Sequence, residues 1–145
     1  MKSIQIRLGS IPEVVALSQA IPEFKDPHTA EVYEERISSV PHLILVAEIE
    51  GEPAGFKVGY ERDRIFYSWM GAVLPAYRRL GIAQKLANQQ EKWAKSQAYT
   101  TIRCKTRNHH KGMFIFALKN GFDVIEVQVK DSIGENRILL QKTIV

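Results

Sequence analysis

A short basic segment, placed between an apolar run and a long amphipathic stretch, holds the residues best suited to chemistry. It reads Val73-Leu74-Pro75-Ala76-Tyr77-Arg78-Arg79-Leu80-Gly81-Ile82-Ala83. Where a helix begins, the first backbone amides lack an acceptor within the helix, and the aligned peptide dipoles place about half a positive charge there. Gly81 has no side chain that would block an anion from those amides, and Ala83, two residues further on, has only a small side chain beside them. Because Arg78 and Arg79 add positive charge, the segment predicts a phosphate-binding site.

Two common nucleotide-binding loops are absent from the sequence. There is no Gly-x-x-x-x-Gly-Lys-Ser/Thr loop, and no Gly-x-Gly-x-x-Gly follows the first predicted strand. ATP and dinucleotides are therefore disfavoured as ligands of the basic segment.

Hydrophobic periodicity predicts the elements that position this segment. Alternating apolar residues predict a strand with one buried face over 4–8, and Ser10, Pro12 and Glu13 predict a capped helix start. Strands are predicted over 4–8, 43–49, 54–60, 65–74, 100–106, 122–130 and 135–145, and helices over 10–21, 32–37, 81–96 and 109–120. The predicted order is therefore β-α-α-β-β-β-α-β-α-β-β.

Composition limits the class of protein. The 145 residues are 45% hydrophobic and 25% charged and contain no repeat or linker, which predicts one globular domain over residues 1–145. The single cysteine, Cys104, rules out an intramolecular disulfide and a Cys-rich zinc module and favours a cytoplasmic location. No run of about 18 apolar residues is present, so no membrane association is expected. The net charge of +4 favours an anionic ligand, and nucleic acid is not expected on this charge alone.

The basic segment resembles the signature of the GCN5-related N-acetyltransferase (GNAT) superfamily. Arg78-x-x-Gly81-x-Ala83 matches the pattern Arg/Gln-x-x-Gly-x-Gly/Ala, and Val73-x-Pro75-x-Tyr77-Arg78 is similar to the family's approach to it. The predicted order of elements and the Asn120-Gly121-Phe122 turn extend the resemblance over nearly the whole chain. The resemblance implies a mixed α/β (α+β) fold, with a mostly antiparallel central sheet of about seven strands flanked by about four helices.

The resemblance also implies a cofactor and its contacts. Acetyl-CoA, or another acyl-CoA, would be the acyl donor, and no metal would be needed. Its pyrophosphate would bind the backbone amides from Arg79 to Ala83 and Gln84, and its pantetheine arm would lie along the strand edge at 72–74. Asn108 would contact that arm, or His110 would if the helix is aligned backwards from Gly121. The expected cofactor-binding residues are Ala72, Val73, Leu74, Arg78, Arg79, Leu80, Gly81, Ile82, Ala83, Gln84 and Asn108.

The catalytic residues are marked less clearly than the cofactor site. Acyl transfer to an amine requires a base, a polarised carbonyl and a proton for the departing thiolate. Many members of the resembled family carry a tyrosine acid four residues before the glycine of the Gly-Phe turn, and that position is Ala117 here. Tyr67 and Ser68 lie in the central strand near where some relatives carry a glutamate, and Glu48 and Glu61 flank the neighbouring strands. Tyr67, acting at one end of a water relay, and Ser68 are therefore the catalytic candidates.

Several neighbouring residues have both a structural and a functional interpretation. The aromatic side chains of 66–69 are expected in the core or on an acceptor pocket, and His28 is expected as an exposed loop residue rather than as a gate for the acceptor. The cations of 103–111 suit the solvated face of a strand or a site for the 3′-phosphate of CoA. Cys104 is expected to pack in the core and not to act as a nucleophile.

Together these patterns predict an N-acetyltransferase that moves an acetyl group from acetyl-CoA to a primary amine of a small molecule or peptide. The alanine at position 117 keeps a second function open, that of an acyl-CoA-binding sensor or regulatory module with little or no turnover. The acceptor is left open, although residues 21–29 and 60–69 are where relatives differ. A homodimer through the last strands is common among relatives, and the sequence leaves the oligomeric state open.

Overall fold

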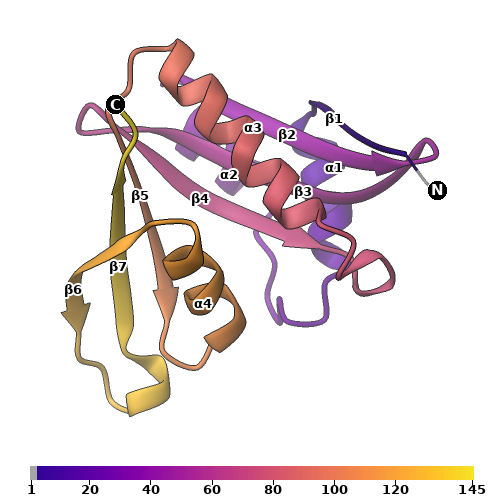
Figure 1. Cartoon of the computed structure of the whole chain (residues 1–145). Coiled ribbons are helices and arrows are strands. Elements are labelled where there is room, and N and C mark those ends of the chain that lie inside the picture. The colour runs from indigo at the N-terminus through magenta and orange to yellow at the C-terminus, as the bar shows by residue number, and fades with distance from the viewer. Residues whose placement is uncertain (1–2) are drawn as a thin grey trace.

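A computed structural model describes residues 3–145 of the chain as one mixed sheet with helices on both faces (Figure 1). The strands are β1 (Ile4–Leu8), β2 (His42–Ile49), β3 (Glu52–Arg62), β4 (Ile65–Val73), β5 (Thr101–Arg107), β6 (Asp123–Gln128) and β7 (Arg137–Thr143). The helices are α1 (Ile11–Gln19), α2 (Ala30–Ile37), α3 (Ile82–Ser96) and α4 (Lys111–Lys119), with single 3₁₀ turns at Pro75–Tyr77 and Ile133–Glu135. The predicted order of strands and helices is confirmed.

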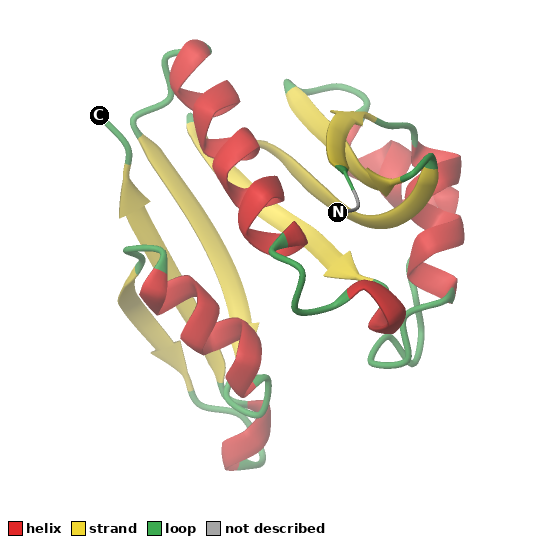
Figure 2. Ribbon diagram, turned by 45° about the vertical axis from the view of Figure 1, so that its right-hand side comes forward, coloured by secondary structure: helices red, strands yellow, loops and turns green. Residues whose placement is uncertain are grey.

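The seven strands follow the order β1-β2-β3-β4-β5-β7-β6 and are mostly antiparallel, as predicted. Within the described part of the chain, the single parallel contact joins β4 to β5 through Phe66–Ile102, Tyr67–Arg103 and Ser68–Cys104. We call these three pairs the β4–β5 seam. Beyond the seam the two strands separate, as Figure 2 shows, so the sheet divides there into two halves.

Each face of the larger half packs against its own helices. Tyr33 and Ile37 of α2 and residues of α1 cover one face over Phe56 and Val58 of β3. On the other face, Leu86 of α3 packs with buried residues of β2 and β3. The smaller half has a separate cluster in which Ala117 of α4 meets Cys104, Ile138 and Leu140. No helix within residues 3–145 is long and apolar enough to span a bilayer.

The start of α1 shows how local sequence fixes an element. The predicted capping box forms, because the Glu13 carboxylate accepts a hydrogen bond from the Ser10 amide at 3.1 Å. The same carboxylate accepts from Arg7 of β1, and Arg7 Nε also donates to Glu48 of β2 at 2.9 Å. One detail of the prediction for the first strand is wrong. Leu8 is 72% exposed, because β1 is the edge strand of the sheet and ends at this residue.

Candidate active site

A cleft with a volume of about 1110 Å³ opens where β4 and β5 separate. Its walls come from β4, the start of α3, the end of β5, the first turns of α4 and the connection between α1 and α2. Most of the residues predicted from the sequence line it: Tyr67, Ser68, Ala72, Val73, Arg78, Arg79, Gly81, Ile82, Ala83 and Gln84. Leu74, Leu80 and Asn108 of the predicted set are not among the lining residues. The fold therefore brings the basic segment and the two catalytic candidates to one cavity.

The N-terminus of α3 presents a row of unbonded amides to this cleft. Within residues 3–145, none of the backbone amides from Arg79 to Gln84 donates a hydrogen bond. Gly81 is the N-cap residue with φ +85°, and a Cβ added there would meet no atom within 4 Å. The left-handed backbone at Gly81 turns the chain into the helix, and the open space before it lets a ligand approach the amides. This arrangement suits an oxygen-rich anion.

The two arginines beside these amides have different surroundings. Arg78 donates to both carboxylate oxygens of Glu23 at 2.9 Å and to the Val73 carbonyl at 3.0 Å. Its guanidinium therefore ties the connection between α1 and α2 to the end of β4 and holds the pKa of Glu23 below its ordinary value. Arg79 is exposed, has φ +67° and forms no ion pair within residues 3–145. Arg79 is thus the arginine with its positive charge uncompensated by a carboxylate.

A bulge in β4 determines which of its side chains face which side. Met70 pairs with Val58 and Ser68 pairs with Gly59, so Trp69 is an extra residue in the ladder. Tyr67, Trp69 and Met70 consequently pack on the side of α1 and α2, whereas Ser68 also lines the smaller pocket on the side of α3. Of the predicted aromatic residues, Tyr67 and Trp69 line the cleft.

Two aromatic predictions are settled by burial. Phe66 is fully buried against Trp93 and Tyr99, which makes it a core residue. His28 was expected as an exposed loop residue, and this prediction is wrong. The His28 ring stacks on Trp69 with 5.3 Å between centroids, and His28 lines the cleft. The connection between α1 and α2 folds back over β4 and carries His28 with it.

Tyr67 lies at the seam with its ring between other side chains. The ring centroid is 5.5 Å from that of Tyr60 and 5.6 Å from the ammonium of Lys105. Burial raises the pKa of Tyr67 to about 12. The hydroxyl therefore stays protonated through the neutral range, which suits donation of a hydrogen bond or a proton better than removal of one.

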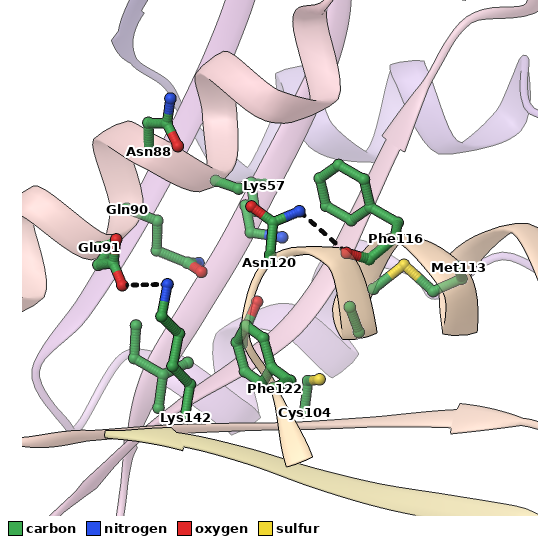
Figure 3. A pocket seen from close by; sticks show the side chains of 14 residues that line it. Lys57, Asn88, Gln90, Glu91, Cys104, Met113, Phe116, Asn120, Phe122 and Lys142 are labelled. Atoms are coloured by element: carbon green, nitrogen blue, oxygen red, sulfur yellow. Dashed lines mark hydrogen bonds and ion pairs between the residues drawn. The ribbon is translucent and has the colours of Figure 1, made fainter. Parts of the chain in front are cut away.

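A smaller pocket of about 40 Å³ lies between α3, α4 and the sheet, as Figure 3 shows. Lys57 of β3 reaches it over Gly71, its partner on β4, which has no side chain to block the way. Burial lowers the pKa of the Lys57 ammonium and raises the pKa of the Cys104 thiol to about 11. Gln90 is 2% exposed, and its Nε2 has no hydrogen-bond partner within the described residues. Lys57, Ser68 and Cys104 line both cavities, so the small pocket adjoins the floor of the cleft.

Comparison with known proteins decides the family. The model of the acetyltransferase (GNAT) family matches residues 12–122. The chain belongs to this family. A comparison with curated proteins found no match.

Solved structures support the GNAT fold over the whole chain. The ribosomal-protein-S18-alanine N-acetyltransferase from Escherichia coli is similar with a TM-score of 0.84 at 15% identity, and the alignment covers 98% of this chain and 94% of that chain. Ard1 from Thermoplasma volcanium gives 0.82 at 19% identity and 98% coverage of each chain. The protein yncA from Salmonella typhimurium, solved with its cofactor acetyl-CoA, gives 0.78 at 14% identity and covers 98% of this chain and 94% of that chain. The resemblance found in the sequence is confirmed at the level of family and fold.

The residues around α4 include three positions that the family resemblance singled out, Asn108, His110 and Ala117. His110, the alternative to Asn108, lines the cleft, while Asn108 donates from its backbone to Asn136 and from its side chain to Ile133. Ala117, where many family members carry a tyrosine, is 2% exposed and lines the small pocket. The position is therefore buried and offers no hydroxyl.

Sequence reasoning missed Lys57, Gln90 and Arg36, which also line these cavities. Lys57 alternates with apolar residues along its strand and therefore looks like part of a solvated face. The available signal was the pair of glycines, Gly55 and Gly59, that flank it on the same face.

Proposed function

We propose that this GNAT protein transfers an acetyl group from acetyl-CoA to a primary amine of a small molecule or peptide, and that residues 1–145 form one acetyltransferase domain. The observation that carries the proposal is the row of unbonded amides from Arg79 to Gln84 at the open N-terminus of α3. Such amides bind phosphate oxygens without a side chain. The similar structure of yncA was solved with acetyl-CoA, which supports the same ligand for this chain.

The residues of the cleft fit acetyl-CoA in two ways. The amides of 79–84 would hold the pyrophosphate, with the charge of Arg79 beside them. Ala72 and Val73 would bind the pantetheine arm, because β4 has no partner strand on the β5 side beyond the seam within the described residues. When bound, acetyl-CoA supplies an activated acyl group.

Tyr67 and Ser68 would act where the two strands part. The acceptor nitrogen must lose a proton before or as it forms the C–N bond, and the C–S bond breaks to release a thiolate. Water molecules bound at one end to the Tyr67 hydroxyl would carry that proton to bulk solvent, while the phenol, which stays protonated, would orient them. Ser68, which pairs with Cys104 in the seam, would donate or accept a hydrogen bond there. Because a thiolate leaves without full protonation more readily than an alkoxide, the proposed transfer would not require a tyrosine acid at position 117.

The buried Ala117 favours one second candidate, an acyl-CoA sensor or regulatory module with little turnover. Purified protein would be mixed with acetyl-CoA and a panel of primary amines, with release of free thiol as the readout. Thiol release that needs both the amine and the protein supports the enzyme. Tight CoA binding by calorimetry without thiol release would support the sensor and overturn the enzyme. The Y67F and S68A variants should keep CoA binding and lower the rate.

We also propose a homodimer through the last strands and a cytoplasmic location. β6 is an edge strand of the sheet, and Val124, Ile125 and Val127 on it are at least 43% exposed. A second copy of the chain would cover these side chains. Sedimentation equilibrium tests the dimer, since V127E should give a monomer if this edge forms the interface. The cytoplasmic location stays a prediction from the single cysteine.

A further inference from the structure

The cleft has a strong excess of positive charge. Among the described residues that line it, the only carboxylate belongs to Glu23, and both of its oxygens are bound by Arg78. Seven lysines and arginines line the same cleft: Arg36, Lys57, Arg78, Arg79, Lys105, Arg107 and Arg137. Arg78 and Arg79 lie at the phosphate end, and Arg107 pairs with Glu135. Arg36, Lys105 and Arg137 form no ion pair with the residues that the structure describes, and their charge has no role in the proposed binding of phosphate.

Three of these cations gather on the side of the sheet covered by α1 and α2. They are Arg36 of α2, Lys105 of β5 and Arg137 of β7, and we call them the cationic cluster. The Arg36 guanidinium lies 4.7 Å from the ring centroid of Trp69 and donates to the Tyr60 hydroxyl at 3.3 Å. The Lys105 ammonium lies over the ring of Tyr67. Aromatic residues of β3 and β4 therefore contact Arg36 and Lys105, two of the three cations of the cluster, at the cleft.

The cluster lacks a matching negative charge. Burial lowers the pKa of Lys105, and Arg62, Arg137 and Arg36 lower it further, while Glu126 is the acid that opposes them. The three cations of the cluster therefore repel one another at the cleft, where, among the described residues, the only lining carboxylate is that of Glu23, already bound by Arg78. An incoming anion would replace this repulsion by attraction and by charge-assisted hydrogen bonds.

We propose that the acceptor is a small primary amine that also carries an anionic group, a carboxylate or a phosphate, and that the cationic cluster binds this group. The inference rests on the proposed acetyl transfer. Lys105 follows Cys104, the last β5 residue of the seam, so this member of the cluster lies one residue, or roughly 3 Å of strand, beyond the seam. That spacing places the amine at the seam when a few bonds separate it from the anionic group.

Matched pairs of amines test the substrate class. The pairs are 4-aminobutanoate with 4-aminobutanamide, and 2-aminoethyl phosphate with ethanolamine, and thiol release from acetyl-CoA gives kcat/KM for each. The anionic member should be preferred about tenfold or more, because one charge-assisted hydrogen bond contributes about 1.5–3 kcal/mol. The preferred pair distinguishes a carboxylate from a phosphate. Equal or better use of the neutral members would overturn the inference while leaving acetyl transfer intact.

Variants of the cluster locate the anion. R36Q, K105Q and R137Q should each lower kcat/KM for the anionic amine about tenfold and leave the neutral partner nearly unchanged. K92Q is the matched control, because Lys92 is an exposed residue of α3 that does not line the cleft. If R36Q, K105Q and R137Q behave like K92Q, the cluster is not the anion site.

A binding measurement separates the anion site from catalysis. Glutarate and inorganic phosphate are titrated by calorimetry into protein saturated with CoA, with 1,5-pentanediol as the neutral control. At least one anion should bind, and the three cluster substitutions should abolish that binding. If no amine is acetylated yet the anion binds through the cluster, the anion site stands and the transferase proposal fails. If neither anion binds, or binding survives all three substitutions, the anion site is overturned.

Discussion

Replacing Gly81 by aspartate and by asparagine isolates the electrostatics of the proposed pyrophosphate site. Aspartate and asparagine have nearly the same shape, and both tolerate the left-handed backbone that Gly81 adopts at φ +85°. A Cβ at this position meets no atom within 4 Å, and the rest of the two side chains has nearly the same volume. The two variants therefore share any steric or conformational cost and differ in one negative charge.

The magnitude follows from Coulomb's law. A carboxylate about 5 Å from one phosphate charge is repelled by about 0.8 kcal/mol at a dielectric constant of 80 and by about 3 kcal/mol at a dielectric constant of 20. The dissociation constant for CoA should therefore be about 4-fold to 200-fold higher for G81D than for G81N. Added salt should reduce the difference, because the site opens to solvent.

Folding and binding should move in opposite directions in this pair. An aspartate at the N-cap of α3 interacts favourably with the helix dipole, so ligand-free G81D should be as stable as G81N or slightly more stable. Calorimetry with CoA and thermal unfolding of the free proteins measure the two effects. Equal CoA affinity of the two variants would refute the placement of the diphosphate at these amides.

Three further predictions follow from the groups described above. K57M should stabilise the ligand-free protein by about 1–3 kcal/mol at pH 7, because it removes a half-buried ammonium whose pKa is lowered by burial and that forms no ion pair with residues 3–145. The pKa of Lys57 is lowered in the folded chain, so between this lowered value and the ordinary lysine value the unfolded chain holds more protons than the folded chain. The natural protein therefore becomes more stable as the pH rises through this range, and the advantage of K57M in urea unfolding should shrink. An equal advantage at pH 7 and pH 10 would contradict this. Cys104, with its pKa raised to about 11, should react with Ellman's reagent at pH 8 roughly 100-fold more slowly in the folded protein than in urea, and equal rates would show an accessible thiol. E13Q should lower the free energy of unfolding by about 0.5–1 kcal/mol at pH 7, because it removes the carboxylate that pairs with Arg7. The difference between the two proteins should disappear as the pH falls through the lowered pKa of Glu13, where the natural side chain also loses its charge. A difference independent of pH in urea melts would argue against the Arg7 ion pair.

The features that sequence reasoning found are local in the chain. The Ser10–Glu13 capping box and the strand-turn-helix from Val73 to Ala83 are each encoded by residues close in sequence, and the spacing of apolar residues carries the order of elements. Leu8 and His28 were misjudged because their exposure depends on a sheet edge and on a folded-back connection. The spacing of apolar residues reveals neither which strand lies at a sheet edge nor how a connection folds back.

The acceptor side of the site depends on contacts between distant segments. The cationic cluster draws Arg36, Lys105 and Arg137 from three elements, and β7 inserts between β5 and β6 to bring the last of them to the cleft. Neither the strand order nor the bulge at Trp69 can be derived from alternation of apolar residues. Lys57 enters the small pocket beside Gly71, its partner on another strand, a pairing that the sequence alone does not reveal.

The β4–β5 seam would couple binding of the proposed acetyl-CoA to the stability of the fold. Three residue pairs of the seam join the larger half of the described sheet to the unit of β5, β6, β7 and α4, together with the Glu91–Lys142 ion pair and the hydrogen bond from Gln84 to Asn120. The smaller unit has its own apolar cluster. Because residues of both halves line the cleft, a molecule bound there would contact both of them. At a concentration 100 times its dissociation constant it would add about 2.7 kcal/mol to the free energy of unfolding. The fraction of folded protein would then rise with the concentration of acetyl-CoA, and the melting temperature would report how much of the site is filled.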